Sequence, residues 1–104
     1  MREDSVFSAL SDGSRRRLLE SLAARESASL SELAAQLPVT RQAVSKHLAA
    51  LSEAGLVEGR RAGRETRYRL TPEPLADALW WMERVGAGWD ERLARLREHR
   101  TNSR

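Results

Sequence analysis

The sequence predicts a mainly helical domain with one small β-hairpin, arranged as a winged helix-turn-helix with five helices and a two-stranded wing. Two observations support this fold class. Pro38 and Thr40 place a tight turn between two amphipathic segments, and the spacing of apolar residues changes from helical to alternating after Gly55. The chain has 104 residues, enough for one domain with a modest core. We therefore expect residues 1–104 to form a single winged helix-turn-helix domain.

Two short helices are predicted at the start of the chain. The first covers about residues 4–10, because three apolar residues fall there on one helical face. Residues 11–14 read SDGS, which breaks that helix and offers capping side chains for the next, over residues 14–25. Residues 27–29 are expected to be a connector. The apolar positions of the two helices are Val6, Phe7, Leu10, Leu18, Leu19 and Leu22.

A helix-turn-helix is expected next. Ser29 and Glu32 have the spacing of a capping box, which predicts the start of a helix that Pro38 ends. Thr40 caps the second helix, and Gly55 suits its C-terminal end because glycine adopts a left-handed conformation easily. The residues expected to face inward on this second helix are Val44, Leu48 and Leu51.

The rest of the chain predicts a hairpin and a long final helix. Residues 56–62 and 65–70 have β character, and in the second of these segments Thr66, Tyr68 and Leu70 alternate with charged residues. The intervening Gly63 supplies a turn. Thr71 and Pro72 suit the cap and first position of a helix, which we expect to reach about residue 98.

Basic residues gather in two of these segments. The formal net charge is only +3, but residues 60–69 contain five arginines against one acid, Glu65. Residues 38–51 contain three basic or imidazole side chains and no acid. Such segregated positive charge favours a polyanionic partner over a uniformly solvated surface.

The acid-free face of the helix after Thr40 suits the major groove of double-stranded DNA. Arginine and lysine can bond guanine, glutamine can bond adenine, and serine can bond either a base or a phosphate. The wing arginines would then lie along the backbone or the minor groove. The predicted DNA contacts are Thr40, Arg41, Gln42, Ser45, Lys46, His47, Arg60, Arg61 and Arg64.

Several functional classes are not supported. The chain has no cysteine, and its two histidines, His47 and His99, are far apart in sequence, so we expect no metal site and no cofactor. No nucleophile with an activating base, paired carboxylates or metal triad is evident, so we do not expect an enzyme. The chain has neither an apolar segment of about 18 residues nor a secretory signal at its start, and we expect no membrane contact and a cytoplasmic location.

The stretches AVSKHLAALSEAGLV and GRRAGRETRYRL resemble, in order and spacing, the ArsR/SmtB family of bacterial winged-helix repressors. This resemblance covers about residues 3–98 and implies a homodimeric regulator that represses transcription from an inverted-repeat operator. The chain departs from the metal-sensing members because it has no cysteine. Its final segment WDERLARL resembles the metal-free branch instead. Gly13 stands where the family often has proline, which puts no function in doubt.

The final helix predicts a dimer interface. Its apolar residues recur at alternating steps of four and three, a heptad pattern longer than a small domain needs for its own core. Gly86 at its centre would let two helices approach closely. Together the terminal helices, about residues 4–10 and 72–98, would form a two-fold interface. Its predicted members are Val6, Phe7, Leu10, Leu75, Leu79, Met82, Gly86, Trp89, Leu93 and Leu96.

Two alternatives remain open at this point. A winged helix can also be a protein-interaction module that does not bind nucleic acid, although a cluster of arginines favours DNA over a protein partner. The three tryptophans, Trp80, Trp81 and Trp89, favour dimer packing, while an aromatic pocket for an effector is the other interpretation. Such an effector, of unknown identity, would be a small molecule or a protein.

Overall fold

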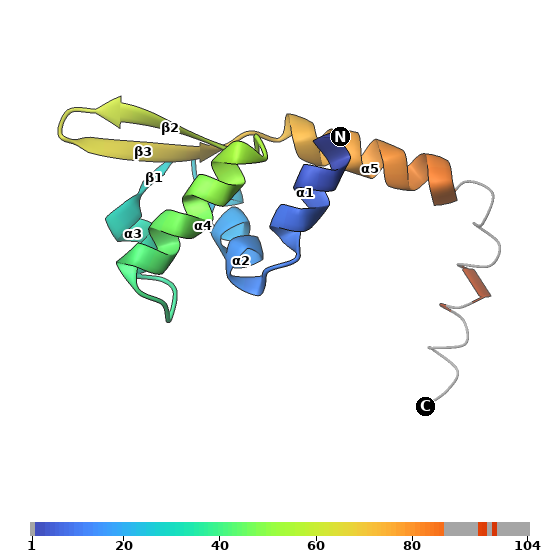
Figure 1. Ribbon diagram of the computed structural model, residues 1–104, viewed down its shortest axis with the longest axis horizontal. Coiled ribbons are helices and arrows are strands. Elements are labelled where there is room, and N and C mark those ends of the chain that lie inside the picture. The colour runs from blue at the N-terminus through green and yellow to red at the C-terminus, as the bar shows by residue number, and fades with distance from the viewer. Residues whose placement is uncertain (1, 87–93, 96, 98–104) are drawn as a thin grey trace.

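The computed structural model describes residues 2–86 together with residues 94, 95 and 97. Within this part of the chain, a helical body carries a β-hairpin at one end, and a long helix extends from the other end (Figure 1). The fold class predicted from the sequence is confirmed. In chain order the elements are α1 (Arg2–Leu10), α2 (Gly13–Ala23), β1 (Ala28–Ser29), α3 (Leu30–Ala34), α4 (Arg41–Glu53), β2 (Val57–Ala62), β3 (Glu65–Leu70) and α5 (Glu73–Gly86).

The sheet contains a short strand that the sequence did not reveal. The strand order is β1-β3-β2, and both pairings are antiparallel. The expected connector at residues 27–29 was therefore wrong in part, because Ala28 pairs with Tyr68 and Ser29 pairs with Arg67. Two residues are too few to show an alternating pattern, and this strand forms only because β3 offers a free edge.

The core lies where the helical body meets the inner face of the hairpin. Apolar side chains from α1, α2, α3 and α4 meet there, and Tyr68 of β3 packs against them. The residues expected to face inward on α4 are buried, and so are the three leucines among the apolar positions expected on α2. The largest core side chains are Val6, Leu18, Leu22, Leu33, Val44, Leu48, Leu51 and Leu56, each with at most 1% of its surface exposed.

Local capping determines where the helices begin. The Asp12 carboxylate accepts hydrogen bonds from the backbone N–H groups of Ser14 and Arg15, at 2.8 and 3.2 Å, and begins α2. The predicted capping box of Ser29 and Glu32 is present at the start of α3. That helix ends at Ala34, earlier than expected, and turns occupy the residues up to the start of α4.

Both expected turn glycines have the left-handed backbone conformation. Gly55 follows α4 with a φ of 75°, and Gly63 closes the hairpin with a φ of 68°. The hairpin pairs Ala62 with Glu65, so its loop has two residues. Side chains other than glycine adopt such angles at a cost, which explains why both chain reversals fall at glycines.

The terminal helices α1 and α5 pack against each other. The ring of Phe7 meets the ring of Trp81 edge to face, with centroids 5.6 Å apart and planes inclined at 64°. This contact packs Trp81 within its own chain, so it tests neither dimer packing nor an effector pocket. Val6 has no exposed surface, so it belongs to the core of its own chain and offers no accessible surface to a partner, contrary to the prediction. Trp89, Leu93 and Leu96 lie outside the described residues.

Arg67 joins the hairpin to the rest of the fold. Its guanidinium donates to the hydroxyl and carbonyl oxygens of Ser27, at 2.9 and 3.1 Å, and forms ion pairs with Glu32 at 3.2 Å and Glu65 at 2.8 Å. The sequence placed Arg67 on the outward side of its strand, but its side chain is only 32% exposed. It therefore ties β3 to the segment that begins α3.

The pH dependence of stability should report the capping box. The backbone N–H of Ser29, and then its hydroxyl and Arg67, hold the pKa of Glu32 below its ordinary value of 4.5. A carboxylate whose pKa is lowered by folding stabilises the native state above its ordinary pKa and loses that contribution as the pH falls through the lowered value. We therefore expect Glu32→Gln to lower the free energy of unfolding at pH 7. At pH values below the lowered pKa, where Glu32 is protonated, the substitution should change the free energy of unfolding very little.

Urea unfolding of both proteins between pH 2 and 7 measures this difference. Glu20→Gln is a matched control, because Glu20 is exposed on α2. Parallel stability curves for the wild type and Glu32→Gln over the whole range would contradict the prediction.

Candidate nucleic-acid interface

One face of α4 is exposed and rich in hydrogen-bond donors. The opposite face is buried in the core through Val44, Leu48 and Leu51. At about 100° per residue, the polar residues of the first two turns lie together on the outer face. No acid occurs in the first turn, and the only acid of the helix is Glu53 at its last position. The exposed side chains of this face are Arg41, Gln42, Ser45 and Lys46.

Thr40 has a structural task at the start of α4. Its hydroxyl oxygen accepts a hydrogen bond from the backbone N–H of Ala43 at 3.1 Å, which caps the helix. The other free N–H groups of the first turn point out of the helix end and carry the positive end of the helix dipole. An anion such as a DNA phosphate is favoured at this end.

His47 does not lie with the other predicted DNA contacts. It is on the far flank of α4, half-buried, and its Nδ1 atom accepts a hydrogen bond from Nε of Arg15 at 3.4 Å. Ser45 and Lys46 are exposed in that turn of the helix. One further helical step of about 100° places His47 on the side of α4 that faces α2. His47 therefore contributes to the packing between α2 and α4 rather than to the exposed face.

The wing arginines divide between the two faces of the hairpin. Side chains alternate along a strand, so Arg61 lies on the face of Val57, which packs on the core. Arg60 lies on the opposite face, and its Nε is bound to Glu58 at 2.8 Å. Arg64 is exposed in the turn at the tip. The sequence grouped these three arginines by their closeness in the chain, but the pleat separates Arg60 from Arg61.

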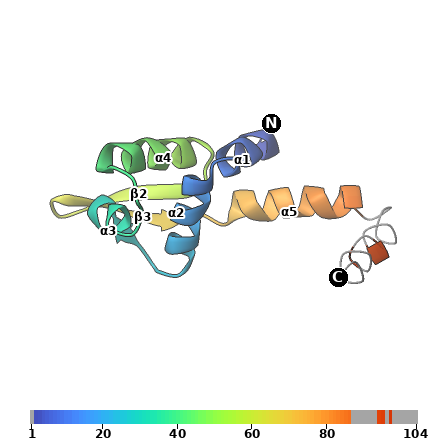
Figure 2. The same ribbon diagram turned by 90° about the horizontal axis from the view of Figure 1, so that it is seen from below.

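Figure 2 shows the relation of α4 to the wing. The helix lies on one side of the hairpin, and the strands extend past its N-terminal half toward the tip (Figure 2). The exposed face of α4 and the tip at Arg64 can thus contact neighbouring parts of one elongated partner. Arg60 faces away from α4.

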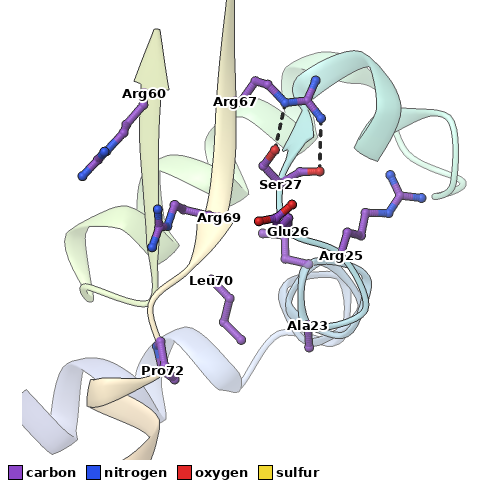
Figure 3. A pocket seen from close by; sticks show the side chains of 10 residues that line it. Ala23, Arg25, Glu26, Ser27, Arg60, Arg67, Arg69, Leu70 and Pro72 are labelled. Carbon is purple, nitrogen blue, oxygen red and sulfur yellow. Dashed lines mark hydrogen bonds between the residues drawn. The ribbon is translucent and has the colours of Figure 1, made fainter. Parts of the chain in front are cut away.

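A second basic surface was missed by the sequence analysis. On the face of the hairpin away from α4, Arg60, Arg67 and Arg69 occupy alternate or facing positions, and Arg25 after α2 lies across from them (Figure 3). The alternation of Arg67 and Arg69 was visible in the sequence. Their meeting with Arg25, more than 40 positions away, was not, because it depends on how α2 packs on the sheet.

The described residues show no arrangement for metal binding and no membrane span. Among them, no three histidine, cysteine, aspartate or glutamate side chains gather as a candidate metal site. No helix in this part of the chain combines the length and the apolar character required to cross a membrane.

Comparisons with known proteins agree with this geometry. A family model described as a helix-turn-helix domain matches residues 10–60. A Bacillus subtilis protein described as an uncharacterized HTH-type transcriptional regulator, YuzN, is 39% identical over 78% of this chain and 96% of its own length. A Synechocystis protein described as a transcriptional repressor SmtB homolog is 45% identical over 62% of this chain and 48% of its own.

A solved structure extends the likeness over nearly the whole chain. An ArsR-like transcriptional regulator from Rhodococcus sp. RHA1 has 46% sequence identity and a TM-score of 0.76, covering 93% of this chain and 91% of the other. Regulators of this kind bind DNA and are not enzymes. The exposed donor-rich face of α4, the wing beside it and these relatives establish that the chain is a winged helix-turn-helix transcriptional regulator of the ArsR family.

Proposed function

We propose that the protein is a homodimeric repressor that binds an inverted-repeat operator, with α4 in the major groove of each half-site. The observation that supports this most directly is the exposed face of α4. Four side chains with hydrogen-bond donors lie on this face, and the first two turns of the helix contain no acid. The Synechocystis relative described as a repressor supports the direction of regulation.

Sequence readout is assigned to the first two turns of α4. Gln42 can form two hydrogen bonds with adenine, and Arg41 or Lys46 can donate to guanine. Ser45 is short enough to allow close approach to a base or a phosphate. Because the far side of α4 is held by buried leucines, these four side chains would keep one orientation toward the groove.

The wing supplies affinity without base readout in this proposal. Arg61 and Arg64 lie near the tip of the hairpin, on the α4 side and in the turn, and would contact phosphates or a narrow minor groove. Arg60 is excluded from this role because it faces the other way and is paired with Glu58.

An exposed apolar surface on α5 supports dimerisation. Leu79, Met82 and Val85 are 54%, 47% and 53% exposed, and Trp80 is 62% exposed. Pro74 and Ala78 are the residues of α5 that are buried against the rest of the chain. The neighbouring heptad positions, Leu79 and Met82, remain exposed to solvent. Exposed apolar clusters of this kind are typical of protein interfaces. Two-fold pairing would place two α4 helices about one DNA turn apart.

Gln42→Ala tests base readout. The tight-binding DNA is a duplex selected from a random pool with the wild-type protein, and a random duplex serves as the reference. We expect the substitution to weaken the selected duplex by about 1–3 kcal/mol and the random duplex by much less, because only the former has the matching base.

Fluorescence anisotropy at fixed salt measures both affinities. Ser52→Ala, an exposed residue of α4 near its C-terminal end, should change neither. Equal losses on the two duplexes would reassign Gln42 to a phosphate contact.

Arg61→Ala combined with Arg64→Ala tests the wing. Each lost phosphate contact removes about one unit from the slope of log affinity against log salt concentration, so the double variant should lose about two units for each protomer, or about four for the homodimer. Arg60→Ala is the matched control on the same hairpin and should keep the wild-type slope. A slope that falls equally in Arg60→Ala would contradict the division of the hairpin into two faces.

Leu79→Glu combined with Met82→Glu tests the dimer. Two charges at the uncovered heptad positions should separate the protomers, while each domain stays folded because these side chains lie outside its core. Sedimentation at about micromolar concentration, where a specific repressor must already be assembled, measures the change.

Arg84→Glu is the control for this experiment, because Arg84 is exposed on another side of α5 from the heptad positions and the substitution changes the charge by the same amount. The double variant should lose operator affinity and keep weak binding to random DNA. A monomeric wild type at that concentration would rule out the proposed assembly.

A further inference from the structure

Lys46 is the only lysine of the chain. All the other members of the 18 lysine and arginine residues are arginines. The two side chains carry the same charge but differ in chemistry, because a lysine amine gives up its proton far more readily than a guanidinium group and is then nucleophilic. Lys46 is therefore the one side-chain amine with which an electrophilic small molecule can form an amide.

The structure leaves this amine open to solvent and without a partner. Lys46 is exposed on the outer face of α4. Within the described part of the chain, its ammonium group forms neither a hydrogen bond nor an ion pair. The first two turns of α4 contain no acid that could hold it. Nothing in this part of the protein therefore competes for the amine.

Small side chains surround Lys46 on its own helix. Residues three and four positions away are neighbours on a helix surface. At Lys46 these neighbours are Gln42, Ala43, Ala49 and Ala50, so three of the four are alanines. A small reagent can approach the amine over this surface without displacing a bulky side chain.

The charge around Lys46 favours an anionic reagent. Arg41 is exposed on the same outer face, at the end of α4 where the helix dipole is positive. An excess of positive charge raises the local concentration of small anions. Activated acyl compounds of two common kinds are anionic, namely acyl phosphates and acyl thioesters whose carrier bears phosphates. The features that suit α4 to a DNA phosphate therefore suit it to these donors as well.

We propose that Lys46 is an acylation site, modified by a small anionic acyl donor of the phosphate or thioester kind. The uncharged amine nitrogen attacks the acyl carbon and a C–N bond forms. The C–O bond of the acyl phosphate, or the C–S bond of the thioester, breaks, and phosphate or thiolate leaves with the electron pair. The proton lost from the nitrogen passes to water or to the leaving group, so the product is a neutral amide.

Acylation would weaken the DNA contact of α4. The step removes one positive charge from each protomer and leaves a single N–H donor where the ammonium group had three. A neutral amide bonds phosphate and guanine acceptors less strongly than a charged donor does. The arginines of the wing cannot react in this way, so the modification would act on α4 alone. This consequence rests on the proposed binding of DNA by α4.

Mass spectrometry tests the reactivity of Lys46. The probes are acetyl phosphate and acetyl-coenzyme A, each incubated with the full chain at weakly basic pH without DNA. We expect at least one of them to acetylate Lys46, and the reactive probe identifies the donor as an acyl phosphate or a thioester. Lys46→Arg should acquire one acetyl group fewer, which separates the side chain from the α-amino group. If neither probe modifies Lys46, the proposal is wrong.

Arg17→Lys provides an internal control. It introduces a second amine on the exposed surface of α2 and keeps the net charge. Lys46 should react faster than the amine at position 17, because Glu20 lies one helical turn from that position and can pair with it. A DNA duplex should slow the reaction of Lys46 and not that of position 17. An equal or slower reaction of Lys46 without DNA would contradict the proposal.

Fluorescence anisotropy with the selected duplex measures the effect on DNA binding. The acetylated wild type should bind at least about tenfold more weakly than the untreated protein. The same treatment should not change the affinity that Lys46→Arg itself has. An unchanged affinity of the acetylated wild type would overturn the inference and leave the proposed repressor function intact. Conversely, if the untreated wild type bound no duplex, the proposed function would fail, whereas the reactivity of Lys46 is measured without DNA.

Discussion

The burial of Val44, Leu48 and Leu51 is the constraint on which the proposed DNA interface depends. Each of these side chains has at most 1% of its surface exposed, so α4 cannot rotate about its axis without exposing apolar surface to water. The orientation of the donor-rich face follows from the position of its apolar face. Base readout requires side chains placed to within a fraction of an ångström, and a helix held only at its ends could not provide that.

A second link transmits this rigidity to the wing. The hairpin extends well beyond the core, and its base is joined to the helical body by the buried Val57, by Tyr68, by the short strand β1 and by Arg67 (Figure 1). Arg67 bonds Ser27 and Glu32 at once, so one side chain connects β3 with the beginning of α3. Glu32 also caps that helix. The start of the helix-turn-helix and the base of the wing therefore share the same hydrogen-bonded cluster.

The hairpin has two basic faces that the structure assigns to different neighbours. Arg61 lies on the face that continues toward α4, and Arg60 lies with Arg67 and Arg69 beside α2. A strand places consecutive side chains on opposite faces, so a run of arginines cannot act as one surface. The first face suits a DNA backbone beside the major groove, and the second lines a hollow beside the end of α2.

Much of this architecture was determined by local sequence. The capping box at Ser29, the cap at Thr40 and the two turn glycines act within a few residues, so the sequence predicted the helix starts and both chain reversals. The exposed face of α4 was predicted for the same reason, since helical periodicity is a local property. The tertiary structure alone decided the pairing of β1, the burial of Val6, the rotation of His47 toward Arg15 and the assembly of Arg25 with the sheet arginines. Each of these depends on contacts between segments far apart in the chain, and hydrophobic periodicity reports which face of an element is buried but not what lies against it.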